Sequence, residues 1–180
     1  DDPRYNTTSP TQKTYLDLYN MEDAWDRSTG DSNIVVAVLD TGIQASHPDL
    51  AENMASGGYD FINGDTSPDD DNGHGTHVAG IIAADSNNGT GITGISWTSK
   101  LLAIKVLNSS GGGNDWKLAQ GIDYARIYDV DVINMSLGGD YVDSGLLPEA
   151  LQDAYNAGIV LVAAAGNENI DLDTSPQSPV

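Results

Sequence analysis

Residues 34–42 read Ile-Val-Val-Ala-Val-Leu-Asp-Thr-Gly, and this stretch decides the fold. Its first six residues are apolar and mostly β-branched, and the run stops at the polar turn Asp40-Thr41-Gly42. A strand without a polar face must be covered on both sides, so the stretch predicts a central strand of a parallel sheet. Three later segments repeat the pattern, at residues 101–107, 130–135 and 158–165.

Predicted helices alternate with these strands, at residues 74–84, 116–128 and 147–156, after a short one at 21–27. Strand–helix alternation predicts an α/β fold: a doubly wound, mostly parallel sheet with helices on both faces. Residues 78–84 are small and apolar all round, which predicts that their helix is buried in the core. We expect one domain, with a surface arm at residues 1–20 and an α/β body at 21–180.

A functional site is expected where the strands end, because ligands of open α/β sheets bind beyond the carboxyl ends of the strands. Asp40, Ser136 and Asn167 follow three of the predicted strands, and His74 lies between two glycines at the start of a helix. A carboxylate beside an imidazole makes an oriented general base, and an amide can donate to an oxyanion. These parts indicate acyl transfer, for which a nucleophile is still needed.

The composition is strongly acidic, with 27 acidic against 7 basic residues and a formal charge of -20. Of the acids, 23 are Asp and 4 are Glu, and with 20 glycines this favours acids in loops, where they turn the chain and bind hard cations. The charge argues against nucleic acid or an anionic membrane as a partner. The sequence has no cysteine and no apolar run of membrane-spanning length, and we expect a mature, processed protein that is secreted.

Four segments resemble, in the same order, the motifs of the subtilisin-like serine proteases (subtilases): Val38–Gly42, His74–Gly80, Ser136–Gly139 and Ala164–Asn167. The N-terminal arm and the loop before the histidine are most similar to the thermitase-like branch. The resemblance runs from about Asp2 to Asn167. It implies a serine endopeptidase that hydrolyses peptide bonds through an acyl-enzyme.

The resemblance also implies roles for individual residues. Asp40 would orient His74, His74 would act as general base and then acid, and Asn167 would donate to the oxyanion. Three glycines would pair with an extended polypeptide substrate or inhibitor, and two short segments would form the walls of the pocket before the scissile bond. These substrate-binding residues are Gly111, Gly112 and Gly113 for the pairing edge, Ser136, Leu137 and Gly138 for one wall, and Ala164, Ala165 and Gly166 for the other.

Two departures from the family pattern affect the expected activity. The family's nucleophile lies in a Gly-Thr-Ser-Met-Ala motif, which is absent from these 180 residues. We therefore expect the N-terminal part of a single subtilase catalytic domain, incomplete at its C-terminus, inactive alone and completed by the serine-bearing remainder as a second chain. A non-catalytic subtilase-like module that binds calcium or peptide is the alternative. Asp115 stands where the thermitase-like pattern has an aromatic residue, which leaves the preference of a distant subsite open.

Calcium is the expected cofactor, at two sites. Residues 60–71 hold five acids, which repel one another unless a cation neutralises some of them or solvent screens them. The resemblance implies a first site formed by Asp60, Asn63, Asp65, Ser67 and Asp69. It implies a second site formed by Asp2, Asp49 and Asn88 through side chains, and by Asp85, Thr90 and Ile92 through carbonyls.

Other interpretations of the same residues have less support. Asp40-Thr41-Gly42 also marks aspartic proteases, but those are β-rich and need two such motifs. His77 follows His74 by one helical turn and suggests a metal pair, but no third ligand stands at a suitable spacing, so we expect a packed histidine. His47 is expected to be structural and the three tryptophans to be packing residues.

Overall fold

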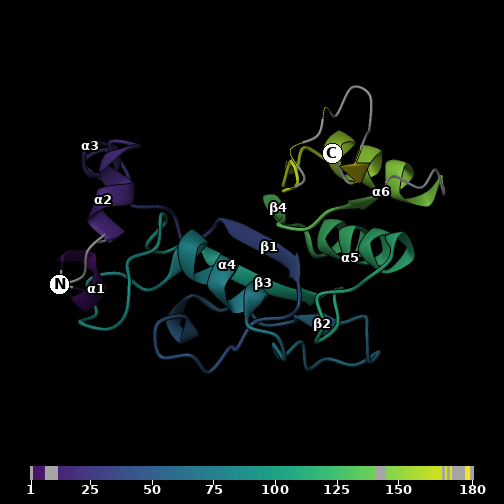
Figure 1. Ribbon diagram of the computed structural model, residues 1–180, viewed down its shortest axis with the longest axis horizontal. Coiled ribbons are helices and arrows are strands. Elements are labelled where there is room, and N and C mark those ends of the chain that lie inside the picture. The colour runs from purple at the N-terminus through teal and green to yellow at the C-terminus, as the bar shows by residue number, and fades with distance from the viewer. Residues whose placement is uncertain are drawn as a thin grey trace.

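The computed structural model describes residues 2–6, 12–140, 145–167, 169, 171 and 177–178. At its centre lies a five-stranded sheet in which all neighbouring strands are parallel, in the order β2-β3-β1-β4-β6 (Figure 1). The strands are β1 (Val35–Asp40), β2 (Tyr59–Asp60), β3 (Lys100–Lys105), β4 (Val132–Met135) and β6 (Val160–Ala163). The predicted parallel α/β fold is confirmed, and β2 is the strand that the sequence did not predict.

Strand β1 occupies the middle of the sheet, as its apolar run predicts. It pairs with β3 on one edge and with β4 on the other, so that Val38 lies beside both Ala103 and Asn134. The residues from Val36 to Asp40 are all buried. Pairing on both edges and cover on both faces fix the position of the end of β1, which carries Asp40.

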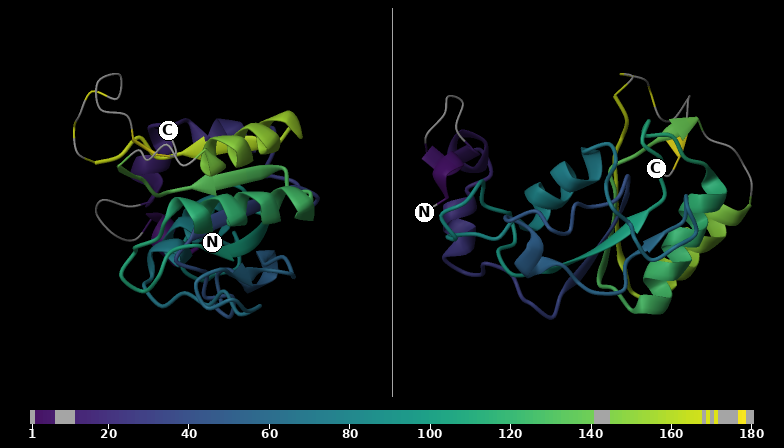
Figure 2. Two further views of the ribbon diagram at one scale, coloured as in Figure 1. Left: turned by 90° about the vertical axis from the view of Figure 1, so that its right-hand side faces the viewer. Right: turned by 90° about the horizontal axis from the view of Figure 1, so that it is seen from below.

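Helices cover both faces of the sheet (Figure 2). Helix α4 (His74–Ala83) packs on one face with a cluster that includes Val38 and Leu101. Helices α5 (Asp115–Tyr128) and α6 (Leu146–Asn156) pack on the other face, over a cluster that includes Leu39 and Ile104. Alternate residues of each strand therefore enter alternate cores. In the described part of the chain, no helix has the length and apolarity to cross a membrane.

Three short helices lie to one side of the sheet (Figure 1): α1 (Pro3–Asn6) and α2 (Gln12–Asp17) in the N-terminal arm, and α3 (Met21–Trp25) directly after it. Hydrogen bonds hold the arm and α3 against the loop after α4. The Arg4 amide donates to the Gly91 carbonyl at 3.0 Å, Gln12 exchanges hydrogen bonds with the Thr93 backbone, and Trp25 Nε1 donates to the Ile95 carbonyl at 2.8 Å. The arm is thus tied to the body at several points.

The remaining regular elements are small. A 3-10 helix, η1 (Ala51–Asn53), follows the loop after β1. Strand β5 (Gly139–Asp140) pairs antiparallel with β7 (Gln177–Ser178) in a separate two-stranded sheet.

Two expectations about burial are wrong. Helix α4 is not buried all round: Ile81 is 49% exposed and His77 is exposed, because only the side of the helix that faces the sheet is covered. Strand β6 was expected to be covered on both faces, but Val160 and Val162 are 56% and 46% exposed. Among the described strands β6 ends the sheet order and pairs with β4 alone, which accounts for this exposure.

We expect Gly121→Ala to destabilise the fold by about 1–3 kcal/mol, because the added methyl group overpacks the core. A Cβ at this position in α5 would lie 2.7 Å from Val106 Cγ1, 3.2 Å from Ile104 Cγ2 and 3.3 Å from Leu39 Cδ2. These side chains are buried and β-branched or tightly packed, so they cannot move aside. The measurement is the free energy of unfolding in a denaturant titration.

Gly80→Ala in α4 is the matched control. A Cβ there would meet only Ile92 Cδ1, at 3.5 Å, which is an ordinary contact. The substitution should stabilise by up to about 1 kcal/mol through helix propensity. Equal effects at the two positions would contradict the packing explanation.

Candidate active site

The side chains of Asp40 and His74 are in direct contact. Nδ1 of His74 lies 2.8 and 2.9 Å from the two carboxylate oxygens of Asp40, which also accepts the Thr41 amide at 2.7 Å. The carboxylate is fully buried, whereas the histidine side chain is 47% exposed. A buried carboxylate at Nδ1 favours the tautomer with its proton on that nitrogen, so Nε2 is the basic nitrogen. The pair has the geometry of an oriented general base.

The close approach of α4 to β1 depends on Gly75. A Cβ at this position would lie 2.1 Å from the Gly42 carbonyl oxygen and 3.1 Å from Asp40 Cβ, so only glycine fits here. The Gly75 amide donates to Thr41 Oγ1 at 3.0 Å, which ties the first turn of the helix to the residue after Asp40. Gly75 is therefore required for packing, whereas Gly73 precedes the first residue of the helix.

Asp70 holds the start of α4 through five hydrogen bonds. Oδ1 accepts from the amides of Asn72 and Gly73 and from Thr41 Oγ1, and Oδ2 accepts from both the amide and the hydroxyl of Thr76. Partial burial would raise the pKa of Asp70, but hydrogen bonds from Thr76, Gly73 and Asn72 outweigh it and lower the pKa to about 2. From the sequence, Asp70 was expected only to be part of an acidic loop. Its position just before a predicted helix start was the available signal.

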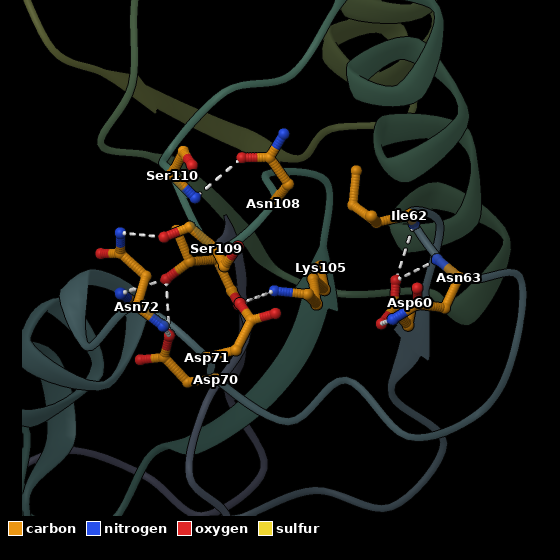
Figure 3. Close-up of polar contacts among 12 residues, drawn as sticks. Asp60, Ile62, Asn63, Asp70, Asp71, Asn72, Lys105, Asn108, Ser109 and Ser110 are labelled. Carbon is orange, nitrogen blue, oxygen red and sulfur yellow. Dashed lines mark hydrogen bonds and ion pairs between the residues drawn. The ribbon is translucent and has the colours of Figure 1, made fainter.

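Asn72 joins the start of α4 to the loop after β3 (Figure 3). Its side chain accepts from the His74 amide at 3.2 Å and donates to the Ser109 carbonyl at 2.9 Å. In that loop, Oδ1 of Asn108 accepts from the amides of Ser110 and Gly112, and these two hydrogen bonds hold a turn. Sequence reasoning missed the role of Asn72 because an Asn-Gly pair by itself indicates only a turn.

A cleft of about 480 Å³ opens beside His74. It is lined by the predicted pairing edge, Gly111–Gly113, and by one predicted wall, Ser136–Gly138. The other predicted wall and the predicted oxyanion donor, residues 164–167, are not among the described residues that line it. They follow β6, where the Ala164 amide donates to the Met135 carbonyl at 3.1 Å. His74, the predicted pairing edge and one predicted pocket wall therefore line the same cleft.

The cleft also includes Asp115, the first residue of α5. Its Oδ2 is buried and has no hydrogen-bond partner among the described residues. Apolar side chains also line this part of the cleft, namely Val106, Leu107 and Leu118, together with the polar Asn114. The cleft therefore combines apolar side chains with the Asp115 carboxylate.

The subtilase family model matches residues 31–180 of the chain. The chain belongs to the subtilase family. The resemblance of its motifs and its subtilisin-like fold are thereby confirmed, and the family is one of serine proteases.

Individual relatives agree with this assignment. Thermitase of Thermoactinomyces vulgaris is 47% identical over 156 residues, which are 87% of this chain and 54% of thermitase. Minor extracellular protease Epr of Bacillus subtilis is 41% identical over 163 residues, 91% of this chain and 24% of that protein. A solved structure of a cold adapted subtilisin-like serine proteinase is 34% identical, with a TM-score of 0.69 over 81% of this chain and 50% of that one. This subtilase chain therefore spans about half, or less, of the length of these relatives.

The first predicted calcium set is not gathered in the structure. The Asp60 carboxylate accepts from the amides of Ile62 and Asn63 and from the Asn63 side chain (Figure 3). Asp65 accepts from the Ser67 amide. Asp69 is exposed. Among the described residues no three acidic or histidine side chains lie close enough to hold a metal ion. Calcium binding by the Asp60 loop stays a prediction.

The second predicted set is partly assembled around two buried acids. Asp2 accepts from the amides of Asn87 and Asn88, and Asp49 accepts from the Asn88 side chain at 3.0 Å and the Ile92 amide at 2.9 Å. Both acids are less than a tenth exposed, and neither has a lysine or arginine partner in the described residues. Two buried carboxylates without a lysine or arginine partner are hard oxygen ligands of the kind that Ca²⁺ prefers.

Asp70→Asn should lower the unfolding free energy at neutral pH by about 1–2 kcal/mol, after allowance for solvent screening. The folded pKa of Asp70, about 2, lies below the ordinary value of 3.8. The stabilisation is therefore complete above pH 4 and is lost as the pH falls through 2. Denaturant titrations at several pH values should show the wild type and the variant converging toward pH 2.

Asp23→Asn is the control for this prediction, because Asp23 is an exposed acid on α3. It should leave the unfolding free energy unchanged within about 0.5 kcal/mol. A constant difference between Asp70→Asn and the wild type from pH 7 to pH 2 would show that Asp70 does not act through its charge.

Proposed function

We propose that this subtilase hydrolyses peptide bonds through an acyl-enzyme, with the general base supplied by this chain. The proposal is carried by the contact of His74 with the buried Asp40 carboxylate, at 2.8 Å, beside a cleft of about 480 Å³. The nucleophilic serine comes from a segment outside these 180 residues, and the active enzyme includes that serine-bearing remainder of the same protease. Membership of the subtilase family supports the assignment.

In the proposed reaction, Nε2 of His74 takes the proton of the serine hydroxyl while the serine oxygen bonds to the scissile carbonyl carbon. The imidazolium that forms is stabilised by the Asp40 carboxylate. Asn167 donates its side-chain amide to the carbonyl oxygen as negative charge develops on it. His74 then gives its proton to the leaving amine as the C–N bond breaks, and a water molecule repeats the sequence to release the acid.

The proposed substrate is an extended polypeptide. Gly111, Gly112 and Gly113 offer backbone groups for pairing by strand addition, and Ser136–Gly138 form one wall of the specificity pocket. Ala164–Gly166 would form the second wall of the pocket. An extracellular location is also proposed, and the printed name of one relative, minor extracellular protease Epr, supports it.

The first test uses the full-length protein and a serine-directed phosphonate, followed by mass spectrometry. We expect one labelled serine outside residues 1–180 and hydrolysis of a peptide substrate. His74→Ala should lower kcat by about 10⁴-fold or more, because the general base is lost. His77→Ala, on the exposed side of the same helix, should leave kcat unchanged.

A protein that takes up no phosphonate and cleaves no peptide would contradict the proposal. It would favour the alternative, a non-catalytic subtilase-like module that binds calcium or peptide.

Asn167→Ala should lower kcat with little change in KM, because the donor acts on charge that exists only in the transition state. The size of the effect is carried over from subtilisin itself, in which removing such a donor costs about 10²–10³ in kcat. Asn169→Ala, two residues on, is the control and should keep the wild-type rate. Equal loss of kcat in both variants would contradict a specific role of Asn167.

We also propose that this subtilase binds Ca²⁺ at the second predicted site. Asp2, Asp49 and Asn88 would hold it through their side chains, and Asp85, Thr90 and Ile92 through their carbonyls. A bound cation would neutralise the two buried acids and tie the N-terminal arm to the loop after α4. A second ion in the Asp60 loop remains part of the proposal from family resemblance alone.

Calcium should raise the midpoint of thermal unfolding, and a chelator should reverse the effect. At a hundredfold excess over Kd, one site contributes about 2.7 kcal/mol of stability. Asp49→Asn should reduce this calcium dependence, while Asp153→Asn, an exposed acid on α6, should keep it. A calcium dependence that survives Asp49→Asn in full would exclude this site.

A further inference from the structure

Lys105 is a buried cation at the end of β3, and the proposed reaction does not use it. The residue is 1% exposed, and its Nζ donates to the Thr41 carbonyl at 2.5 Å and to the Asp71 carboxylate at 2.6 Å. Figure 3 shows the contact of Lys105 with Asp71. Thr41 follows Asp40 directly, and Asp71 lies three residues before His74. The ammonium group therefore bridges the two segments that carry the catalytic pair.

The register of the sheet adds a second observation. Lys105 of β3 pairs with Asp40 of β1 on one side and with Asp60 of β2 on the other. In-register residues of parallel strands direct their side chains to the same face, so the three lie in one row at the carboxyl ends of the strands. All three are buried. The row alternates in charge, and the lysine lies between the two acids.

A buried ammonium group is costly unless it is paired, and a buried charge with fixed partners is held rigidly. Lys105 has one neutral partner, the Thr41 carbonyl, and one charged partner, Asp71. Neither partner is the Asp40 carboxylate, which accepts hydrogen bonds from His74 and from the Thr41 amide. The lysine thus leaves the Asp40 oxygens to the histidine while it supplies positive charge on the neighbouring strand.

We propose that Lys105 is a positioning residue for the Asp40–His74 pair, and that Asp71 anchors it. This inference rests on the proposed function, because it concerns the same pair. The Nζ atom of Lys105 fixes the end of β1 relative to the loop that leads into α4. The charge of Lys105 acts on the His74 imidazole through the buried row of Asp40, Lys105 and Asp60. Asp70 holds the same loop by accepting hydrogen bonds from amides and hydroxyls, so Asp70 and Lys105 act on different parts of the loop.

The charge acts in a defined direction. The elements around His74 carry several charged and titratable groups. They are Asp40 on β1, Asp69, Asp70 and Asp71 in the loop before α4, His77 on α4, Lys100 and Lys105 on β3, and Asp115, Lys117, Asp123 and Arg126 on α5. Among the described residues of this set, Lys105 is the buried cation, whereas Lys100 donates to the Glu52 carbonyl, Lys117 to the Phe61 carbonyl and Arg126 to Asp123. The positive charge of Lys105 disfavours the protonated, cationic form of His74. Asp71 is negative and favours that form. Removing one or the other should therefore move the pH dependence of the reaction in opposite directions.

The test compares Lys105→Met and Asp71→Asn in the full-length protein, with kcat/KM measured from acid to alkaline pH. The acid limb of this profile reports protonation of the general base. We expect its midpoint to rise by about 0.5–1 pH unit in Lys105→Met and to fall by a smaller amount in Asp71→Asn. In Lys105→Met, kcat at the optimum should also fall about 10-fold, because the pair is less well aligned.

Lys100→Met is the matched control. Lys100 begins the same strand, and its Nζ also donates to a backbone carbonyl, that of Glu52 at 2.8 Å, but at the opposite end of β3. The acid limb of the kcat/KM profile of Lys100→Met should match that of the wild type. Thermal unfolding of all three variants shows which of them are folded.

The order of the midpoints decides the outcome. A midpoint above the wild type for Lys105→Met and below it for Asp71→Asn supports the proposal, and any other order overturns it, even where kcat falls. Should Lys105→Met not fold, Asp71→Asn decides alone, since Asp71 is half-exposed and its loss is tolerable. An inactive wild type overturns the proposed function and this inference together, whereas an active wild type with unmoved midpoints overturns this inference alone.

Discussion

Burial of the Asp40 carboxylate is the constraint on which the rest of the site depends. An anion that is removed from water must find hydrogen-bond donors, and this one finds them in His74 and in its own neighbour Thr41. To provide the histidine, helix α4 has to approach the end of β1 closely enough that only glycine fits at position 75. The burial of one carboxylate therefore fixes the position of a helix, the spacing of its glycines and the orientation of an imidazole.

The loop before α4 transmits this constraint to the other elements. Three consecutive residues, Asp70, Asp71 and Asn72, make contacts in three directions: to the helix start and β1, to the end of β3, and to the loop after β3. Hydrogen bonds therefore hold this loop, which has no regular structure, against three neighbouring parts of the fold. Asp70 and Asp71 accept hydrogen bonds here, whereas the acidic composition of the region by itself suggests cation binding.

The sequence predicted the parts of the fold that depend on local pattern. The four apolar runs and the helices between them all formed, because an apolar strand and its crossover helix are specified by residues that are close in sequence. Strand β2 was missed because it is two residues long and exists through its pairing with β3 and the contact of Tyr59 with Phe61 and Tyr124. Exposure of β6 was missed for a related reason: an apolar run does not say how many neighbours its strand will have. The contacts of Lys105 with Thr41 and Asp71 could not be predicted, because no spacing in the sequence says which distant groups a buried lysine faces. For Asp70 a local signal existed, its position just before a predicted helix start.

The proposed catalytic parts differ in how far the described structure supports them. The base is complete within it, since Asp40 and His74 stand on elements that are packed or paired on every side toward the core. Asn167 follows β6, which among the described strands is paired along one edge and leaves Val160 and Val162 half-exposed. Strand apolarity on both faces implies cover on both faces, so the sequence of β6 calls for contacts that the described residues do not provide. The oxyanion donor and the second pocket wall therefore depend on whatever covers β6, whereas the general base does not.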